Sequence, residues 1–512
     1  MPRFRPVLVS AAVLATAALA MTGCASSATA TGGSGSGTAP TSIAIGLTSA
    51  VVSLDPADAG TVRSDRGVAA SVYSALVSVD AKQKPHPDVA TSWKQLSSTE
   101  WRFTLNPKAV FSDGTTPVDA DVVKWNFDRL LSPTSKHSIS AYLQTIKSVD
   151  VVDKHTVDVT LKGPDVSLFL VLPYIDFLDP EWAGTHQPAT EAFGSGPYEV
   201  KSFTPSGDIQ LTANPNYWGA KPAIKNVSYH VYSDATAEAN ALITDEIQFA
   251  GDLEPKDLSR VKQVSSLKLV QAASIRAAFI KLNTEQKPLD NKQVRQALNY
   301  AVDKKTIIKS LLGNSTTESQ GQVLTPYFVG FNKSLKPYPY DPAKAKKLLA
   351  AAGYPNGFTL TIDVPIGTYV EGQNITQAIN QQLQKVGVTL KENDLPFATY
   401  LQRYTTLHQL SQAAYLTQSQ LSTDRFLGLF QTGSPYAYWE NAEFTDDVNK
   451  GRYALTTAEA ASYYEKAVTV MRDEAPVIFL FPQPKVYAVP KDITWTERDD
   501  EWILPADFGV AK

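Results

Sequence analysis

Only one cysteine occurs among the 512 residues, and this residue, Cys24, stands directly behind a charged and apolar leader. One thiol cannot form an internal disulfide, so a folded body of this length must be held together by core packing. Arg3 and Arg5 form the positive flank of the leader, and an apolar run at 7–21 follows them. That run is short for a bilayer span and has the length of a signal-peptide core, which indicates export.

The residues around Cys24 resemble a bacterial lipoprotein signal, in which the thiol is acylated and becomes the first residue of the mature protein. The small residues Thr22 and Gly23 precede the cysteine, although Met21 stands where leucine is usual. We therefore predict a signal peptide at 1–23, a lipid anchor at Cys24 and a location on the outer face of the cytoplasmic membrane. The alternative is an ordinary signal peptide with a chance cysteine.

The segment after the cysteine, 24–40, is rich in Ser, Thr, Gly and Ala and is expected to form a flexible tether. The chain as a whole is 43% hydrophobic and 19% charged, which is typical of a well-packed globular protein of two or three domains. Its 47 basic and 51 acidic residues form no positive cluster, so we expect no nucleic-acid partner.

Strand and helix patterns are mixed along the chain without a strict repeat. Segments 101–105 and 156–161 alternate apolar and polar residues with period two, which is typical of half-buried strands. Helical spacing of apolar residues instead marks 294–301 and 342–352, the second with Asp341 as its expected cap. The pattern predicts an α/β (mixed α+β) class with more than one domain.

No catalytic motif can be assembled from the sequence. A phosphate-binding loop needs a Gly-Lys dipeptide and a serine elbow needs G-x-S-x-G, and the sequence contains neither. The six histidines are scattered, so no local metal site is predicted, and Cys24 is committed to the anchor. The adjacent acids at 446–447 and 499–500 are expected to be solvated surface rather than acid–base pairs. We therefore expect no enzyme activity, no cofactor and no metal.

Six short motifs follow one another along the chain, at 53–56, 111–122, 194–198, 214–218, 283–303 and 340–354. Together with the leader, they resemble the family 5 extracellular solute-binding proteins of ABC importers. The most specific is Phe-Ser-Asp-Gly-Thr-Thr-Pro-Val at 111–118, a tight Asp-Gly turn before a helix start. Physically, most of these motifs are turns, caps and core stripes, which define a fold and need not touch a ligand.

The resemblance implies a two-lobed, periplasmic-binding-protein-like fold with a hinge and an additional subdomain in lobe one. Lobe one is expected at 41–280, and its inserted subdomain at about 85–195. Lobe two is expected at 281–482, and residues 483–512 are expected to return to lobe one. The ligand would lie between the lobes, and closure around it would present a new surface to the permease.

In peptide-binding relatives, an aspartate shortly after a Trp-containing strand meets the ligand's ammonium group, and an arginine in the preceding segment meets its carboxylate. Here Tyr415 takes the place of the tryptophan, Gln418 that of the aspartate, and Thr368 falls near that of the arginine. The last two positions are neutral and Asp424 is the nearest acid, so a zwitterionic dipeptide is disfavoured. Neutral groups beside aromatic rings would suit a sugar-like, blocked or longer ligand. The candidate ligand-binding residues are Ser53, Asn283, Thr368, Tyr369, Tyr415, Thr417, Gln418, Tyr436 and Trp439.

The resemblance therefore implies a lipid-anchored binding protein that captures an oligopeptide or related small solute and delivers it to the permease of an ABC transporter. A sugar or opine binder of the same family, a receptor for signalling molecules and a secreted hydrolase are the alternatives. We expect a monomer whose membrane contact is the lipid anchor alone.

The anchor can be tested by replacing its thiol. The Cys24→Ala variant should leave the membrane and appear in the soluble fraction or the medium, because no acyl chain can then be attached. Fractionation and immunoblotting measure this, with Ser27→Ala in the expected tether as a matched control that stays membrane-bound. Retention of Cys24→Ala in the membrane fraction would count against the anchor.

Overall fold

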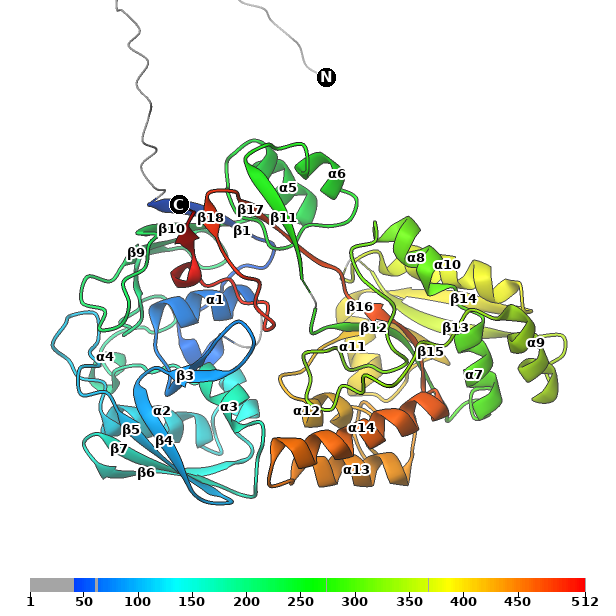
Figure 1. Ribbon diagram of the computed structural model, residues 1–512, viewed down its shortest axis with the longest axis horizontal. Helices are drawn as coiled ribbons and strands as arrows, with labels where there is room; N and C mark the ends of the chain where they lie inside the picture. The colour runs from blue at the N-terminus through cyan, green and yellow to red at the C-terminus, as the bar shows by residue number, and fades with distance from the viewer. Residues whose placement is uncertain (1–40, 60–62, 273, 367, 512) are drawn as a thin grey trace, which may run out of the picture. The chain divides into compact units, whose positions relative to one another are not determined.

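The structure is a computed structural model, and its described residues belong to one unit at 40–512 (Figure 1). The predicted signal peptide, Cys24 and the predicted tether lie outside the described residues. Within the described part of the chain, no helix has both the length and the apolar character needed to cross a bilayer. The described residues are 41–59, 63–272, 274–366 and 368–511.

Strands and helices alternate irregularly, as the sequence pattern predicts. The strands are β1 (Ser42–Leu47), β2 (Val77–Val79), β3 (Pro85–Pro87), β4 (Ala90–Ser97), β5 (Glu100–Leu105), β6 (Ile146–Asp153), β7 (Thr156–Leu161), β8 (Tyr198–Phe203), β9 (Ile209–Ala213), β10 (Asn226–Val231), β11 (Leu267–Ala272), β12 (Ala277–Leu282), β13 (Phe358–Pro365), β14 (Val388–Leu395), β15 (Ala413–Gln418), β16 (Val477–Pro482), β17 (Lys485–Pro490), β18 (Ile493–Thr494) and β19 (Gly509–Val510). The α-helices are α1 (Arg63–Val72), α2 (Ala120–Leu131), α3 (Leu168–Val171), α4 (Pro180–Ala183), α5 (Ala235–Ile243), α6 (Leu258–Val261), α7 (Lys292–Tyr300), α8 (Lys304–Leu311), α9 (Pro342–Ala351), α10 (Gly372–Gln384), α11 (Phe397–Thr405), α12 (Thr423–Gly428), α13 (Ala442–Arg452) and α14 (Thr457–Glu474). The short 3₁₀ helices are η1 (Pro56–Asp58), η2 (Ser138–Tyr142), η3 (Leu172–Tyr174) and η4 (Pro505–Asp507).

Two four-stranded sheets form in the first half of the chain. One has the order β1-β10-β9-β8, in which β1 runs parallel to β10, and the other is antiparallel with the order β4-β5-β7-β6. The alternation in the sequence of β7 places Val157, Val159 and Leu161 on one face of the second sheet, where they are buried in the core. The strands predicted at 101–105 and 156–161 are therefore confirmed.

A five-stranded sheet with the order β14-β13-β15-β12-β16 forms in the second half of the chain (Figure 1). Strand β13 runs parallel to β14 and β15, whereas β12 runs antiparallel to β15 and β16. Because side chains alternate along a strand, the side chains of β12 pack into two separate hydrophobic cores. Ala278 and Ile280 pack with α7, α8, α9 and α10, while Phe279 packs on the opposite face with α11 to α14. A sheet covered by helices on both faces agrees with the predicted class.

Helix boundaries follow local chemistry that is visible in the sequence. The Asp341 side chain accepts a hydrogen bond of 2.8 Å from the backbone N–H of Lys344 and caps α9, with Pro342 in the first turn. The helix is followed by Gly353, whose φ of +93° suits glycine. The helices expected at 294–301 and 342–352 are thus confirmed within two residues.

The C-terminal segment returns to the first-half sheets. Strand β17 pairs antiparallel with β11, and Tyr487, Trp495 and Phe508 share a core with residues of β1. The chain thus crosses between the two sets of sheets twice, from β11 to β12 and from β16 to β17. These crossings agree with two connecting strands at a hinge, while the expected lobe boundaries stay predictions.

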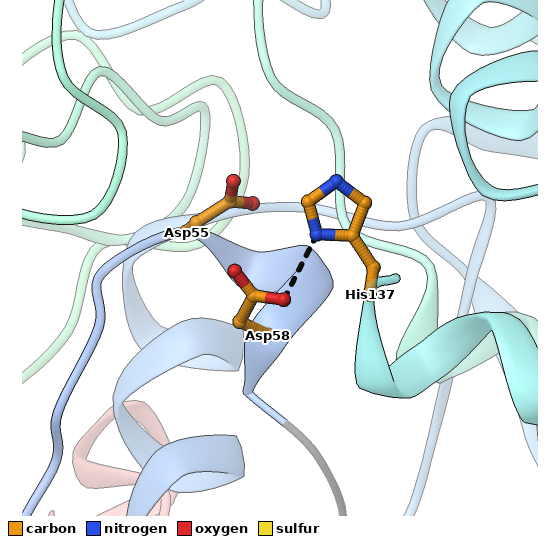
Figure 2. A group of neighbouring side chains, drawn as sticks. All are labelled: Asp55, Asp58 and His137. Carbon is orange, nitrogen blue, oxygen red and sulfur yellow. Dashed lines mark hydrogen bonds and ion pairs between the residues drawn. The ribbon is translucent and has the colours of Figure 1, made fainter. Parts of the chain in front are cut away.

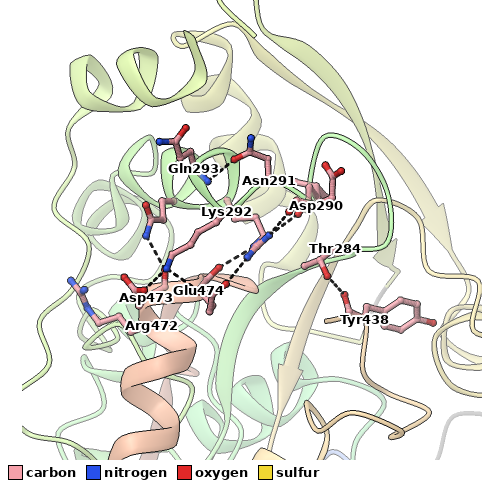
Figure 3. A network of polar contacts seen from close by, with 12 residues as sticks. Thr284, Asp290, Asn291, Lys292, Gln293, Tyr438, Arg472, Asp473 and Glu474 are labelled. Atoms are coloured by element: carbon pink, nitrogen blue, oxygen red, sulfur yellow. Dashed lines mark hydrogen bonds and ion pairs between the residues drawn. The ribbon is translucent and has the colours of Figure 1, made fainter. Parts of the chain in front are cut away.

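A polar network joins the start of α7 to the end of α14 (Figure 3). Arg295, which is nearly buried, donates to Glu474 Oε2 over 3.1 Å and to the carbonyl oxygen of Leu289 over 3.0 Å. Lys292 Nζ donates to Glu474 Oε1 over 2.9 Å and also contacts Asp473. Burial lowers the pKa of Arg295, so its charge depends on these partners.

Removing the carboxylate at the centre of this network should be costly. We expect Glu474→Ala to lower the free energy of unfolding by about 1–3 kcal/mol, because Arg295 would lose its ion pair while remaining buried. The neighbouring Asp473 is 67% exposed, so Asp473→Ala should cost less than about 0.5 kcal/mol. Urea unfolding of both variants measures the difference. Equal losses of unfolding free energy in the two variants would show that the ion pair with Arg295 does not contribute more to stability than the exposed carboxylate.

Candidate functional site

Two cavities share a lining residue, Arg276, at the crossing between β11 and β12. The first has a volume of about 150 Å³ and is bounded by the turn after β1, by α1 and by Tyr229 of β10. The second has a volume of about 80 Å³ and lies between aromatic residues of the first half and the segment after β15. Arg276 lines both cavities, and the C-terminal segment contributes Trp502 to the second and Ile503 to the first.

Aromatic rings form one wall of the second cavity. The ring centroids of Tyr142 and Tyr174 are 6.2 Å apart, and Trp502 meets Tyr174 edge-on at 4.9 Å. Ser419 and Gln420, which follow β15, supply polar groups to the same cavity. An apolar, aromatic wall combined with a few polar groups is typical of a small-molecule binding site.

The aromatic wall is held by a buried arginine of α1. Arg66 is fully buried, and its Nη2 donates to Asp176 Oδ2 over 2.8 Å. Its guanidinium lies 4.9 Å from the ring centroid of Tyr174 and 5.1 Å from that of Trp502, so one cation stacks on both rings. Burial raises the pKa of Asp176, and the charge of Arg66 opposes that rise.

A contact between distant segments borders the second cavity. Arg425 of α12 donates to the carbonyl oxygen of Tyr142 over 2.7 Å and lies 5.1 Å from the centroid of its ring. Tyr327 donates its hydroxyl hydrogen to the carbonyl oxygen of Leu421 over 3.3 Å. Residues of the first half and residues after β15 are therefore in direct contact at this cavity.

Arg276 is the cation shared by the two cavities. Its backbone N–H donates to Ser274 Oγ over 3.0 Å, and its carbonyl oxygen accepts from the N–H of Gln483 over 2.8 Å. These bonds fix the backbone at the crossing. The guanidinium, which is half-buried, has no ion pair or hydrogen bond with any residue that the structure describes.

The acidic residues around the cavities have partners of their own. Asp252 accepts from Thr48 Oγ1 over 2.6 Å and lies 3.3 Å from Lys485 Nζ. Asp500 forms a 2.7 Å ion pair with Arg498. Burial of Asp500, which is 6% exposed, corrects the expectation that 499–500 is solvated surface. Asp447 is likewise buried at 8% exposure, so each adjacent pair has one buried member.

One of the predicted ligand-binding residues, Tyr369, is affected by the charge of Arg276. Burial raises the pKa of Tyr369 to about 12, and the positive charge of Arg276 and the backbone of Thr417 oppose the rise. A tyrosine with this pKa keeps its hydroxyl proton at neutral pH.

The remaining predicted residues of β15 lie on different faces of the sheet. Tyr415, which is 1% exposed, packs in the core with α10, and its ring centroid is 5.9 Å from that of Tyr369. Gln418 follows Thr417 and so points to the opposite face. Its Oε1 is buried and has no hydrogen-bond partner among the described residues. The two side chains therefore lie on opposite faces of the sheet, and their roles toward a ligand stay predictions.

The other candidates hold turns and core in the structure. Ser53 Oγ accepts from the N–H of Asp55 over 3.1 Å. Asn283 is buried and donates to the carbonyl oxygen of Leu410 over 3.3 Å. Thr368 is exposed, and Trp439 packs on Phe444 in the core, with ring centroids 5.1 Å apart. Their roles toward a ligand stay predictions.

Folding brings one histidine to two acids that the sequence separates. Asp55, Asp58 and His137 place ligand atoms within 4.8 Å of one another, and His137 Nδ1 lies 2.8 Å from Asp58 Oδ1 (Figure 2). Asp55 also accepts from the Arg129 guanidinium and from the N–H of Ala57 over 3.0 Å. The nearby cation and these bonds occupy the oxygens of Asp55, which makes the group a poor cation site.

Tyr436 is joined to a buried lysine of β12. Lys281 is 1% exposed, and its Nζ donates to Tyr404 Oη over 3.0 Å and to the carbonyl oxygen of Tyr436. The ring centroid of Phe430 is 4.2 Å from Nζ, and no carboxylate of the described residues pairs with it. Burial lowers the pKa of Lys281 to about 7.

The lowered pKa of Lys281 makes stability depend on pH in a definite direction. Between pH 7 and the unfolded-state value of about 10.4, the unfolded chain binds more protons than the folded protein, so stability rises with pH. Relative to Lys281→Met, the wild type should gain about 2–4 kcal/mol of unfolding free energy from pH 7 to pH 10. Lys305→Met is the matched control, because Lys305 is 82% exposed. A difference that stays constant with pH would contradict the lowered pKa.

Comparison with known proteins agrees with this architecture. The family model described as "Bacterial extracellular solute-binding proteins, family 5 Middle" matches residues 84–438. The glutathione-binding protein GsiB of Pectobacterium atrosepticum is 30% identical over 486 residues, which cover 88% of this chain and 90% of that protein.

Solved structures share the fold along nearly the whole chain. HbpA2 from Haemophilus parasuis has a TM-score of 0.82 at 23% identity and covers 92% of this chain and 100% of its own. DppA from Helicobacter pylori, an ABC transporter-associated periplasmic binding protein in complex with the peptide STSA, has a TM-score of 0.76 at 22% identity and covers 93% and 99%. The likeness confirms the expected two-lobed, periplasmic-binding-protein-like fold.

Proposed function

Because the chain belongs to the bacterial extracellular solute-binding proteins of family 5, we propose that it is a lipid-anchored receptor for a short peptide or peptide-like solute. As a member of this family, the protein binds a solute outside the cytoplasm and delivers it to an ABC importer. The ligand class, the anchor at Cys24, the monomeric state and the lack of catalysis are the proposed parts.

The second cavity is the observation that carries the proposal. Its aromatic wall of Tyr142, Tyr174 and Trp502 faces the polar segment after β15, and Arg276 stands at its edge. Stacking rings bind flat or apolar groups, while side-chain amides and hydroxyls orient a peptide backbone. The cavity is small in this structure, so a ligand must be admitted by movement at the two crossings.

The relatives support a peptide-like ligand. GsiB is named for glutathione, and the DppA structure holds the peptide STSA. Both are short peptides with a free carboxylate, and both contain apolar as well as polar parts. We assign the same ligand class, short peptides and peptide-like solutes, to the present chain without naming an individual solute.

Binding and turnover can be separated in one experiment. Purified protein is incubated with glutathione or with Ser-Thr-Ser-Ala, its melting temperature is measured, and the peptide is then recovered for mass spectrometry. A receptor should melt at a higher temperature with its ligand, since ligand at a hundredfold excess over Kd adds about 2.7 kcal/mol, and should return the peptide intact.

Two outcomes would contradict the proposal in different ways. Cleavage of a peptide during incubation would make the protein an enzyme. No rise in melting temperature with either peptide, together with a non-peptide solute found by native mass spectrometry of protein purified from its own cells, would remove the peptide class. Native mass spectrometry of the same sample also reports the oligomeric state.

A further inference from the structure

We infer that Arg276 is the anion-recognising residue of the ligand site and that the ligand presents a carboxylate to it. The inference rests on the proposed function and deepens it, because it names the chemistry by which one residue selects the solute. Three observations carry it: the place of Arg276 at both cavities, its unpartnered guanidinium, and the partners that neighbouring charges already have.

Arg276 lies where a ligand in either cavity would contact it. The residue lines the cavity of about 150 Å³ beside β1 and the cavity of about 80 Å³ beside the aromatic wall. It precedes β12, so it stands where the chain passes between the two sets of sheets. A solute in either cavity would therefore lie close to Arg276.

The half-buried guanidinium of Arg276 has no partner among the described residues. Two other arginines close to these cavities form ion pairs, Arg66 with Asp176 over 2.8 Å and Arg498 with Asp500 over 2.7 Å, and Arg425 donates to the carbonyl oxygen of Tyr142 over 2.7 Å. Arg276 is half-buried and forms no such bond with the described residues. A guanidinium that is partly removed from water is stabilised by pairing, so this position favours an oxyanion.

The neighbouring acids are bonded to groups other than Arg276. Asp252 is engaged by Thr48 and Lys485, and Glu501 accepts from Ser274 Oγ over 2.7 Å. An incoming carboxylate can therefore reach Arg276 without breaking an existing ion pair with these acids. A guanidinium offers two parallel N–H donors that match the two oxygens of a carboxylate, which favours this anion over a neutral amide.

The backbone of Arg276 is fixed by Ser274 and Gln483, which reduces the ordering cost of binding.

The test compares a free carboxylate with a blocked one. Calorimetric titrations measure the Kd of Ser-Thr-Ser-Ala and glutathione, and of their C-terminal amide and diethyl ester, with wild type and Arg276→Gln. We expect the free acids to bind wild type at least about tenfold more tightly than the blocked forms. Arg276→Gln should weaken free-acid binding by about tenfold or more and change blocked-form binding by less than about twofold.

Matched variants separate this role from a general charge effect. Arg102→Gln removes a cation whose side chain is 42% exposed in its pair with Asp158, and should leave every Kd unchanged. Arg276→Lys keeps the charge but loses the two-pronged geometry, and should fall between wild type and Arg276→Gln. If Arg276→Gln does not fold by circular dichroism, added salt should weaken only the free acids on wild type.

The outcomes distinguish the inference from the proposed function. Equal binding of free and blocked peptides by wild type would overturn the role of Arg276 and leave peptide capture intact. Unchanged free-acid binding by a folded Arg276→Gln protein would overturn it as well. If wild type binds neither form of either peptide, the proposed peptide class fails, and the inference fails with it.

Discussion

The antiparallel pairing of β12 with both β15 and β16 is the constraint on which the rest of the structure depends. This strand enters the five-stranded sheet directly from the first-half sheets, and each of its faces supports a separate helical layer. It fixes Arg276 at its start and buries Lys281 near its end. A shift of one residue in its register would exchange the two cores and move Lys281 to the other helical layer.

Local features of the fold could be predicted because their causes are local. The alternation in β7 and the cap of α9 each depend on residues within a few positions of one another. The two-lobed fold needed the six motifs, since no periodicity states how distant strands pair. The second return of the chain, in which β17 pairs with β11, joins residues more than two hundred positions apart.

The candidate site is harder to predict because it depends on which face of a strand each residue occupies. The sequence places Tyr415 and Gln418 three positions apart on one strand, so their side chains lie on opposite faces, which the sequence comparison alone does not reveal. Arg276, the proposed anion-binding residue, is not among the residues predicted from the sequence, because the positions that carry charges in relatives correspond to other segments of this chain. A signal was present, since Arg276 is a charged residue directly before the apolar run at 277–280. The union of His137 with Asp55 and Asp58 had no such signal, because the residues lie about eighty positions apart.

The C-terminal segment determines when, during folding, the two cavities are completed. Trp502 and Ile503 complete the two cavities, and Tyr487 and Phe508 complete the core around β1. In the chain, Trp502 and Ile503 follow every other lining residue of the cavity that each of them completes. The two cavities are therefore complete only after this segment has folded back onto the core around β1, so the candidate site cannot form before the longest-range contacts of the fold.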